Sequence, residues 1–147
     1  MNRLDFEIIR NVIAAPKDTS MILDVPMILD VGCENGELLK FLNKKKKIDG
    51  RGLEISQKNV NICVKHGLSV VQGDADKDLI AYPSKSFDFV ILSQTLQATH
   101  SPEKVLSQLV RISKYAIVSF PNFGSWLVRL KLLINGKIGR ASCRERV

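Results

Sequence analysis

Three acidic residues each stand where an apolar stretch of the chain ends. Asp30 lies in the run 27–31, Glu54 closes a second short run, and Asp74 follows a third. If these runs are parallel strands, their carboxyl ends meet at one edge of a sheet, where ligands bind in open α/β folds. A common crevice would then gather the three carboxylates. Carboxylates accept hydrogen bonds from hydroxyl and amino groups, so the sequence predicts a site for a ligand that carries both.

The turn after Asp30 narrows the chemistry of that ligand. It reads Gly32-Cys33-Glu34-Asn35-Gly36 and leads into a helix, whose first N–H groups are free to bind a ligand. A dinucleotide-binding turn reads G-x-G-x-x-G, but here the middle glycine is absent and Glu34 would repel a pyrophosphate. S-adenosylmethionine has an ammonium group, a sulfonium, a ribose and no phosphate. We therefore expect Asp30 to face its methionine part, Glu54 its ribose hydroxyls and Asp74 its adenine amino group.

Several of these residues have ordinary structural explanations, which stay open from sequence. Asp74 alone fits a solvated loop carboxylate or a helix N-cap. Ser93, Gln94 and Thr95 follow an apolar run, and they either bind the ligand or form a turn. The cysteines and the lone His66 and His100 lack metal-ligand spacing, and no Ser/His/Asp set supports hydrolase chemistry. Methyl transfer needs less apparatus, because the sulfonium is already activated and orientation does much of the work.

The elements that must position these residues alternate along the chain. Apolar spacing predicts helices at 3–14, 37–46, 56–65, 102–112 and 124–134, and strands at 27–31, 51–55, 68–72, 87–93 and 115–120. Asp49-Gly50 is expected to turn the chain, and 73–76 to form a loop. Alternation of this kind predicts an α/β fold, a Rossmann-like doubly wound and mostly parallel sheet with helices on both faces.

Composition is that of an ordinary folded domain of 147 residues, with 45% hydrophobic and 25% charged residues. The formal net charge is +7, and part of it lies in the run Lys44–Lys47. Cations suit a helix C-terminus, and no aromatic residues interleave the run, so we expect no nucleic-acid partner. No apolar run is long enough to cross a membrane, and the N-terminus lacks the features of a signal peptide. We therefore expect a cytoplasmic protein.

The expected bounds of the domain follow from where the alternation of helices and strands stops. Residues 139–147 are polar, basic and aperiodic, so we assign the domain to 1–138 and interpret the remainder as a foreign end. In this interpretation the sheet lacks C-terminal strands. Met21-Ile22-Leu23-Asp24-Val25 nearly repeats 27–31, and we interpret it as a small insertion.

The run from Ile28 to Gly36 resembles the first motif of class I S-adenosylmethionine-dependent methyltransferases, with Glu34 at the position of that motif's middle glycine. Longer runs at 50–56, 71–76, 87–98 and 119–124 resemble the methionine biosynthesis proteins of the MetW type, over about residues 4–137. The cofactor-binding residues that we expect are Asp30, Gly32, Cys33, Gly36, Glu54, Ile55, Asp74, Ala75 and Ser93.

The resemblance implies a role in methionine biosynthesis in company with homoserine O-acyltransferase. Two functions remain open. One is a cofactor-binding partner of that enzyme without turnover of its own, and the other is an S-adenosylmethionine-dependent methyltransferase acting on a small molecule. The sequence names no methyl acceptor.

Overall fold

The computed structural model describes residues 3–14, 25–93 and 95–119. The helix expected at 124–134, the segment 139–147 and most of the near-repeat at 21–25 lie outside these ranges.

The described part is built on one sheet of five strands, in the order β3-β2-β1-β4-β5, and every pairing is parallel. The central strand therefore has two strands on either side, and the direction of winding reverses between β1 and β4. In sheets of this kind the crevice for ligands opens at that reversal. The strands are β1 Met27–Val31, β2 Asp49–Glu54, β3 Ser69–Gln72, β4 Phe87–Ser93 and β5 Ser113–Ser119.

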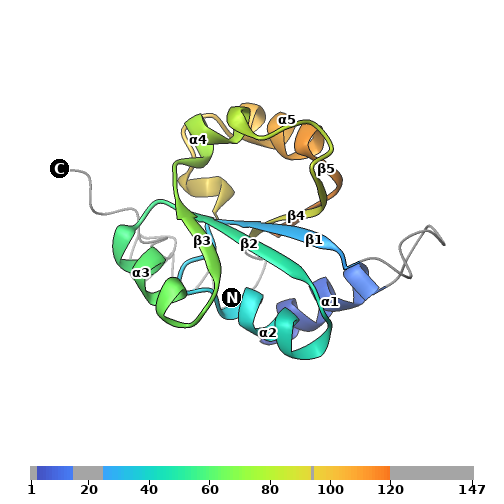
Figure 1. The fold of residues 1–147 in the computed structure, drawn as a ribbon. Coiled ribbons are helices and arrows are strands. Elements are labelled where there is room, and N and C mark those ends of the chain that lie inside the picture. Colours follow the sequence, from blue (N-terminus) through green and yellow to red (C-terminus); the bar gives the residue numbers. More distant parts are fainter. Residues whose placement is uncertain (1–2, 15–24, 94, 120–147) are drawn as a thin grey trace, which may run out of the picture.

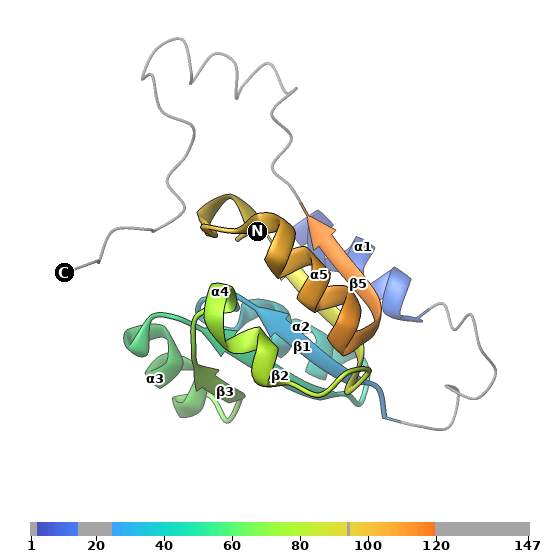
Figure 2. The same cartoon turned by 90° about the horizontal axis from the view of Figure 1, so that it is seen from above.

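Helices cover both faces of the sheet, as predicted. Figure 1 shows α1, α2 and α3 on one side and α4 and α5 on the other, and in Figure 2 α3 lies at the β3 end. Two short 3₁₀ turns, η2 and η3, were not predicted. The elements are α1 Arg3–Ala14, α2 Glu37–Lys45, α3 Gln57–Lys65, α4 Ala75–Asp78, η2 Leu79–Ala81, η3 Leu96–Ala98 and α5 Pro102–Ile112.

The core forms because successive side chains of a strand point to opposite faces. On β1, Ile28 packs into a cluster with Ile9 of α1 and Leu38 of α2. Its neighbour Leu29 packs into another cluster with Leu109 of α5. Packing on both faces thus fixes the buried central strand, and with it the position of the strand's carboxyl end.

Three expected boundaries were wrong, and each correction has a physical reason. β5 begins at Ser113 rather than at the expected 115, because Ser113 pairs with Phe87 of β4. Asp49-Gly50 does not turn the chain but begins β2, because it pairs with Met27 and Ile28 of β1. Pairing in the sheet outweighs the local turn preference of this dipeptide. The expected loop 73–76 ends early, since Asp74 caps α4 and Ala75 begins it.

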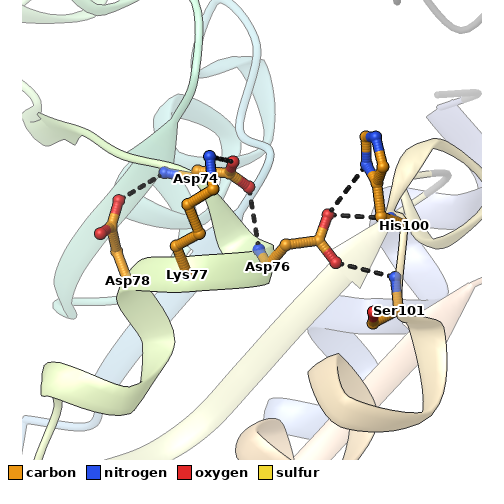
Figure 3. Close-up of polar contacts among 6 residues, drawn as sticks. All are labelled: Asp74, Asp76, Lys77, Asp78, His100 and Ser101. Atoms are coloured by element: carbon orange, nitrogen blue, oxygen red, sulfur yellow. Dashed lines mark hydrogen bonds and ion pairs between the residues drawn. The ribbon is translucent and has the colours of Figure 1, made fainter.

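Asp76 joins the short α4 to the start of α5 (Figure 3). Its carboxylate accepts hydrogen bonds from the backbone N–H groups of His100 and Ser101, both at 2.9 Å, and the His100 ring lies 3.5 Å away. Partial burial acts to raise the pKa of Asp76, but these backbone hydrogen bonds hold it below its usual value. The ionised carboxylate therefore fixes the residues that directly precede α5 from a distant part of the chain.

We expect Asp76→Ala to lower the free energy of unfolding by about 1–2 kcal/mol, because two charge-assisted bonds at a helix start are lost. The matched control is Lys77→Ala, which removes an exposed ion pair to Asp74 and should change stability by less than about 0.5 kcal/mol. Urea unfolding followed by circular dichroism measures both. Equal effects of the two changes would show that Asp76 is an ordinary surface acid.

Candidate functional site

The turn between β1 and α2 is bound tightly to the end of β2. The N–H of Gly32 donates to the carbonyl of Leu53 at 2.7 Å, and the N–H of Gly36 donates to the carbonyl of Cys33 at 2.8 Å. Gly32 has a φ of 72°, and a Cβ there would collide with the side chain of Thr95. Glycine is therefore required by both backbone conformation and space. The turn begins directly over the end of the central strand.

Glu54 closes β2 and fixes this turn from the other side. The side chain is 6% exposed, and its two oxygens accept from the backbone N–H of Glu34, at 2.8 Å, and of Ser56, at 2.9 Å. An ionised carboxylate has about four acceptor positions, so two remain for a ligand. The residue expected to bind ribose hydroxyls is thus held rigidly and still has acceptor capacity.

Asp30 is the most unusual ionisable group of the described chain. It is 1% exposed, and its Oδ1 has no hydrogen-bond partner among the described residues. Burial, followed by the charges of Glu54 and Glu34, raises the pKa of Asp30 to about 7. Buried polar atoms are normally paired, so this carboxyl group is suited to a ligand that brings a donor or a positive charge.

A pocket at the ends of β1 and β4 brings together four of the predicted residues, Asp30, Gly32, Cys33 and Ser93. Phe6 also lines it, although the sequence did not single this residue out. The helical spacing of Phe6 with Ile9 and Ile13 could have indicated that its side chain faces the sheet. Its ring lies 5.6 Å from that of Phe41, which fixes α1 against α2. The remaining lining residues are Glu34, Asn35, Glu37 and Leu38.

Five predicted residues do not line this pocket, and the Glu54 described above is one of them. Gly36, with a φ of 74°, is the N-cap of α2, where a Cβ would collide with Leu68. Ile55 is 65% exposed beside Glu54. Ala75 packs against the core cluster below α5. Asp74 accepts from the N–H of Asp76 at 2.9 Å as the N-cap of α4, which confirms the capping alternative (Figure 3). A contact between Asp74 and an adenine stays a prediction.

Ser93 and Thr95 form a turn at the end of β4. The Thr95 hydroxyl donates to the Ser93 carbonyl at 2.9 Å. The turn alternative is therefore confirmed for Thr95, while the Ser93 side chain remains at the pocket. Gln94 lies outside the described residues.

The two described cysteines are reduced and neutral. Cys33 and Cys63 are free and buried, and burial raises the pKa of both thiols. The Cys63 thiol donates to the carbonyl of Glu34 at 3.3 Å, so it supports the turn. Across the described ranges no group of three or more His, Cys, Asp or Glu side chains is placed to hold a metal ion. Within the same ranges, no helix has the length and apolar character needed to cross a membrane.

The raised pKa of Asp30 predicts a pH dependence of stability. Between its ordinary value of 3.8 and about 7, the folded chain keeps a proton that the unfolded chain has lost. Stability of the ligand-free protein should therefore fall as the pH rises through this range. We expect Asp30→Asn to be more stable than the parent at pH 8, by about 2–4 kcal/mol, and similar to it at pH 4.5. Urea unfolding at both pH values checks this. A difference of the same size at the two pH values would contradict the raised pKa.

Comparisons of sequence place the chain among methionine biosynthesis proteins. A family model described as "Methionine biosynthesis protein MetW" matches residues 3–144. The bifunctional methionine biosynthesis protein MetXA/MetW of Rhodopirellula baltica is 32% identical over 122 residues, which are 78% of this chain and 20% of that protein. Ajmaline N-methyltransferase of Rauvolfia serpentina is 31% identical over 94 residues, 58% of this chain and 32% of that enzyme. The chain thus spans a fifth to a third of these relatives.

Comparisons of structure confirm the expected fold. A S-adenosylmethionine-dependent methyltransferase from Thermotoga maritima superposes with a TM-score of 0.61 and 28% identity, over 76% of this chain and 52% of that one. A methyltransferase of the same class from Archaeoglobus fulgidus gives a TM-score of 0.66 at 24% identity, over 89% and 60% of the two chains. Both matches support the Rossmann-like methyltransferase architecture that the sequence motifs indicated.

Proposed function

The chain belongs to the MetW family of methionine biosynthesis proteins, and from this premise we propose that it binds S-adenosylmethionine at the carboxyl ends of β1 and β2. The observation that carries the proposal is the buried, unpartnered Oδ1 of Asp30 in the pocket beside the glycine turn. A ligand with an ammonium group and a sulfonium supplies what this atom lacks.

The residues around Asp30 fit the rest of that cofactor. Glu54 has acceptor positions left for both ribose hydroxyls, and its two backbone bonds hold it ready. Gly32 permits close approach of the ligand to the backbone. Ile55, exposed next to Glu54, offers an apolar contact for the adenosine part. Glu34 and Asp30 together make the site unfavourable for a pyrophosphate, which favours this cofactor over NAD.

Bound S-adenosylmethionine would supply a methyl group already activated by a positively charged sulfur. The contribution of this chain would be to orient the cofactor through Asp30 and Glu54 and to keep its apolar side dry with Phe6 and Leu38. Cys33 and Cys63 are buried and neutral, so neither is suited to attack the methyl group.

We further propose that the chain works with homoserine O-acyltransferase. Support comes from the Rhodopirellula relative, whose printed name joins MetXA and MetW in one bifunctional protein. Parts that act together in one chain often act together as separate chains. The second candidate function, methyl transfer to a small molecule, is favoured by the likeness to the methyltransferase of Thermotoga maritima.

Calorimetry should detect binding of S-adenosylmethionine and no binding of NAD. Glu54→Ala should weaken binding by about 2–3 kcal/mol, because charge-assisted bonds to the ribose are lost and solvent recovers part of their energy. Glu103→Ala, which removes an exposed acid on α5, serves as the matched control and should bind as the parent does. Thermal melting must accompany the titration, since Glu54 also holds the turn at Glu34.

NAD binding without S-adenosylmethionine binding would overturn the proposal. Unchanged affinity in a folded Glu54→Ala variant would remove Glu54 from the site.

Co-expression with the acyltransferase of the same organism tests the second proposal. We expect the two proteins to elute together in size-exclusion chromatography, because a non-catalytic partner needs a stable docked state. Separate elution, together with transfer of labelled methyl groups from S-adenosylmethionine to a small acceptor, would instead favour the independent enzyme.

A further inference from the structure

Three acidic residues, Asp30, Glu34 and Glu54, form a cluster at the turn that follows the central strand. We infer that this cluster makes the site selective for the charged cofactor, S-adenosylmethionine, over its neutral product, S-adenosylhomocysteine, and that Glu34 is the specificity-determining residue. The inference rests on the proposed function and assigns a preference within the same site.

A hydrogen bond and strand pairing fix the backbone positions of these acidic residues. The N–H of Glu34 is bound to the Glu54 carboxylate at 2.8 Å, so the backbone position that carries the Glu34 side chain is fixed beside Glu54. Asp30 lies in register between Gly52 of β2 and Ile91 of β4, and is 1% exposed with an unpartnered oxygen. Asp30 and Glu34 line the same pocket. A ligand in this pocket therefore meets at least two carboxylates at once.

The other groups around Asp30 do not neutralise this charge. Glu54 and Glu34 both act to raise the pKa of Asp30, and the thiols of Cys33 and Cys63 stay protonated. The remaining elements at the pocket contribute Phe6 from α1, Ser93 from β4, and Leu38 and the further acid Glu37 from α2. The charge of Lys40 on α2 acts to lower the pKa of Cys63. In the part of the chain that the structure describes, no lysine, arginine or histidine lines the pocket.

The two ligands differ only in the methyl group and the charge on sulfur. S-adenosylmethionine carries a sulfonium where S-adenosylhomocysteine carries a neutral thioether, and the amino acid, ribose and adenine parts are the same. Any repulsion between Glu34 and the carboxylate of the ligand therefore affects both equally. Attraction to the sulfonium is added only for S-adenosylmethionine. The ratio of the two dissociation constants isolates this attraction.

The two ligands should also differ in the number of protons that the chain releases on binding them. The free chain keeps a proton on Asp30 below about pH 7, and a nearby sulfonium favours loss of that proton. S-adenosylmethionine should thus release more protons on binding than S-adenosylhomocysteine does. By the same linkage, the preference for S-adenosylmethionine should grow as the pH rises from 6 to 8.

The experiment is calorimetry with both ligands at pH 6 and pH 8, in buffers with different heats of ionisation, so that affinity and proton release are measured together. For the parent chain we expect the preference for S-adenosylmethionine to rise several-fold between the two pH values. Glu34→Gln should lower the preference about two- to fivefold at pH 8, since one exposed carboxylate of the pocket is lost. The matched control, Glu103→Gln on α5, removes an exposed acid and should leave the preference unchanged.

Asp30→Asn should abolish the pH dependence of the preference and the difference in proton release. Glu34 is exposed, so the Glu34→Gln result does not depend on whether Asp30→Asn folds. If both ligands bind and the preference is the same in the parent and in Glu34→Gln, the inference is wrong while the proposed function stands. If neither ligand binds, the proposed function fails and the inference fails with it.

Discussion

The carboxylate of Glu54 holds the end of β2 to the turn that leaves β1. It accepts one N–H from Glu34 and one from Ser56, so a single buried side chain orders the turn before α2 and the start of α3. The glycine turn takes its shape around these bonds, with Gly32 tied to the Leu53 carbonyl as well. Without them, the backbone of Glu34 would lose a buried acceptor, and the wall of the pocket would lose its fixed position.

This arrangement has an electrostatic cost that is informative about function. A buried acid beside a second buried acid is unfavourable for folding, and Asp30 is in that situation with an oxygen left unpaired. Proteins commonly tolerate such groups at sites where a ligand supplies the missing partner. Among the described residues, the other buried side-chain oxygens without a partner, Ser86 Oγ and Ser119 Oγ, belong to neutral hydroxyl groups. The unpartnered buried atom that belongs to an ionisable group therefore lies at the pocket, where a positively charged ligand would supply its missing partner.

Much of the fold was predictable because it depends on local patterns. The apolar runs Met27–Val31 and Phe87–Ser93 and the helix Pro102–Ile112 have the bounds that the sequence indicated, since each is closed by turn or capping residues. The start of β2 was not predictable in this way, because Asp49-Gly50 is extended only through its pairing with β1.

In the site, too, features set by local sequence patterns were predictable and those set by long-range contacts were not. That Asp30, Gly32, Cys33 and Ser93 would meet followed from parallel strands ending at one edge. The bonds from Glu54 to Glu34 and from Asp76 to Ser101 did not, because each joins residues at least 20 positions apart. Local spacing carries no information about such long-range side-chain contacts.

A crystal structure of the chain with S-adenosylmethionine would test the central claim most directly. The account predicts ligand density over the carboxyl ends of β1 and β2, with both ribose hydroxyls on Glu54 and the methionine part facing Asp30, while Glu34 and Ser56 keep their bonds to Glu54. Density at another face of the sheet, or a bound cofactor that leaves Asp30 unpartnered and Glu54 untouched, would contradict it.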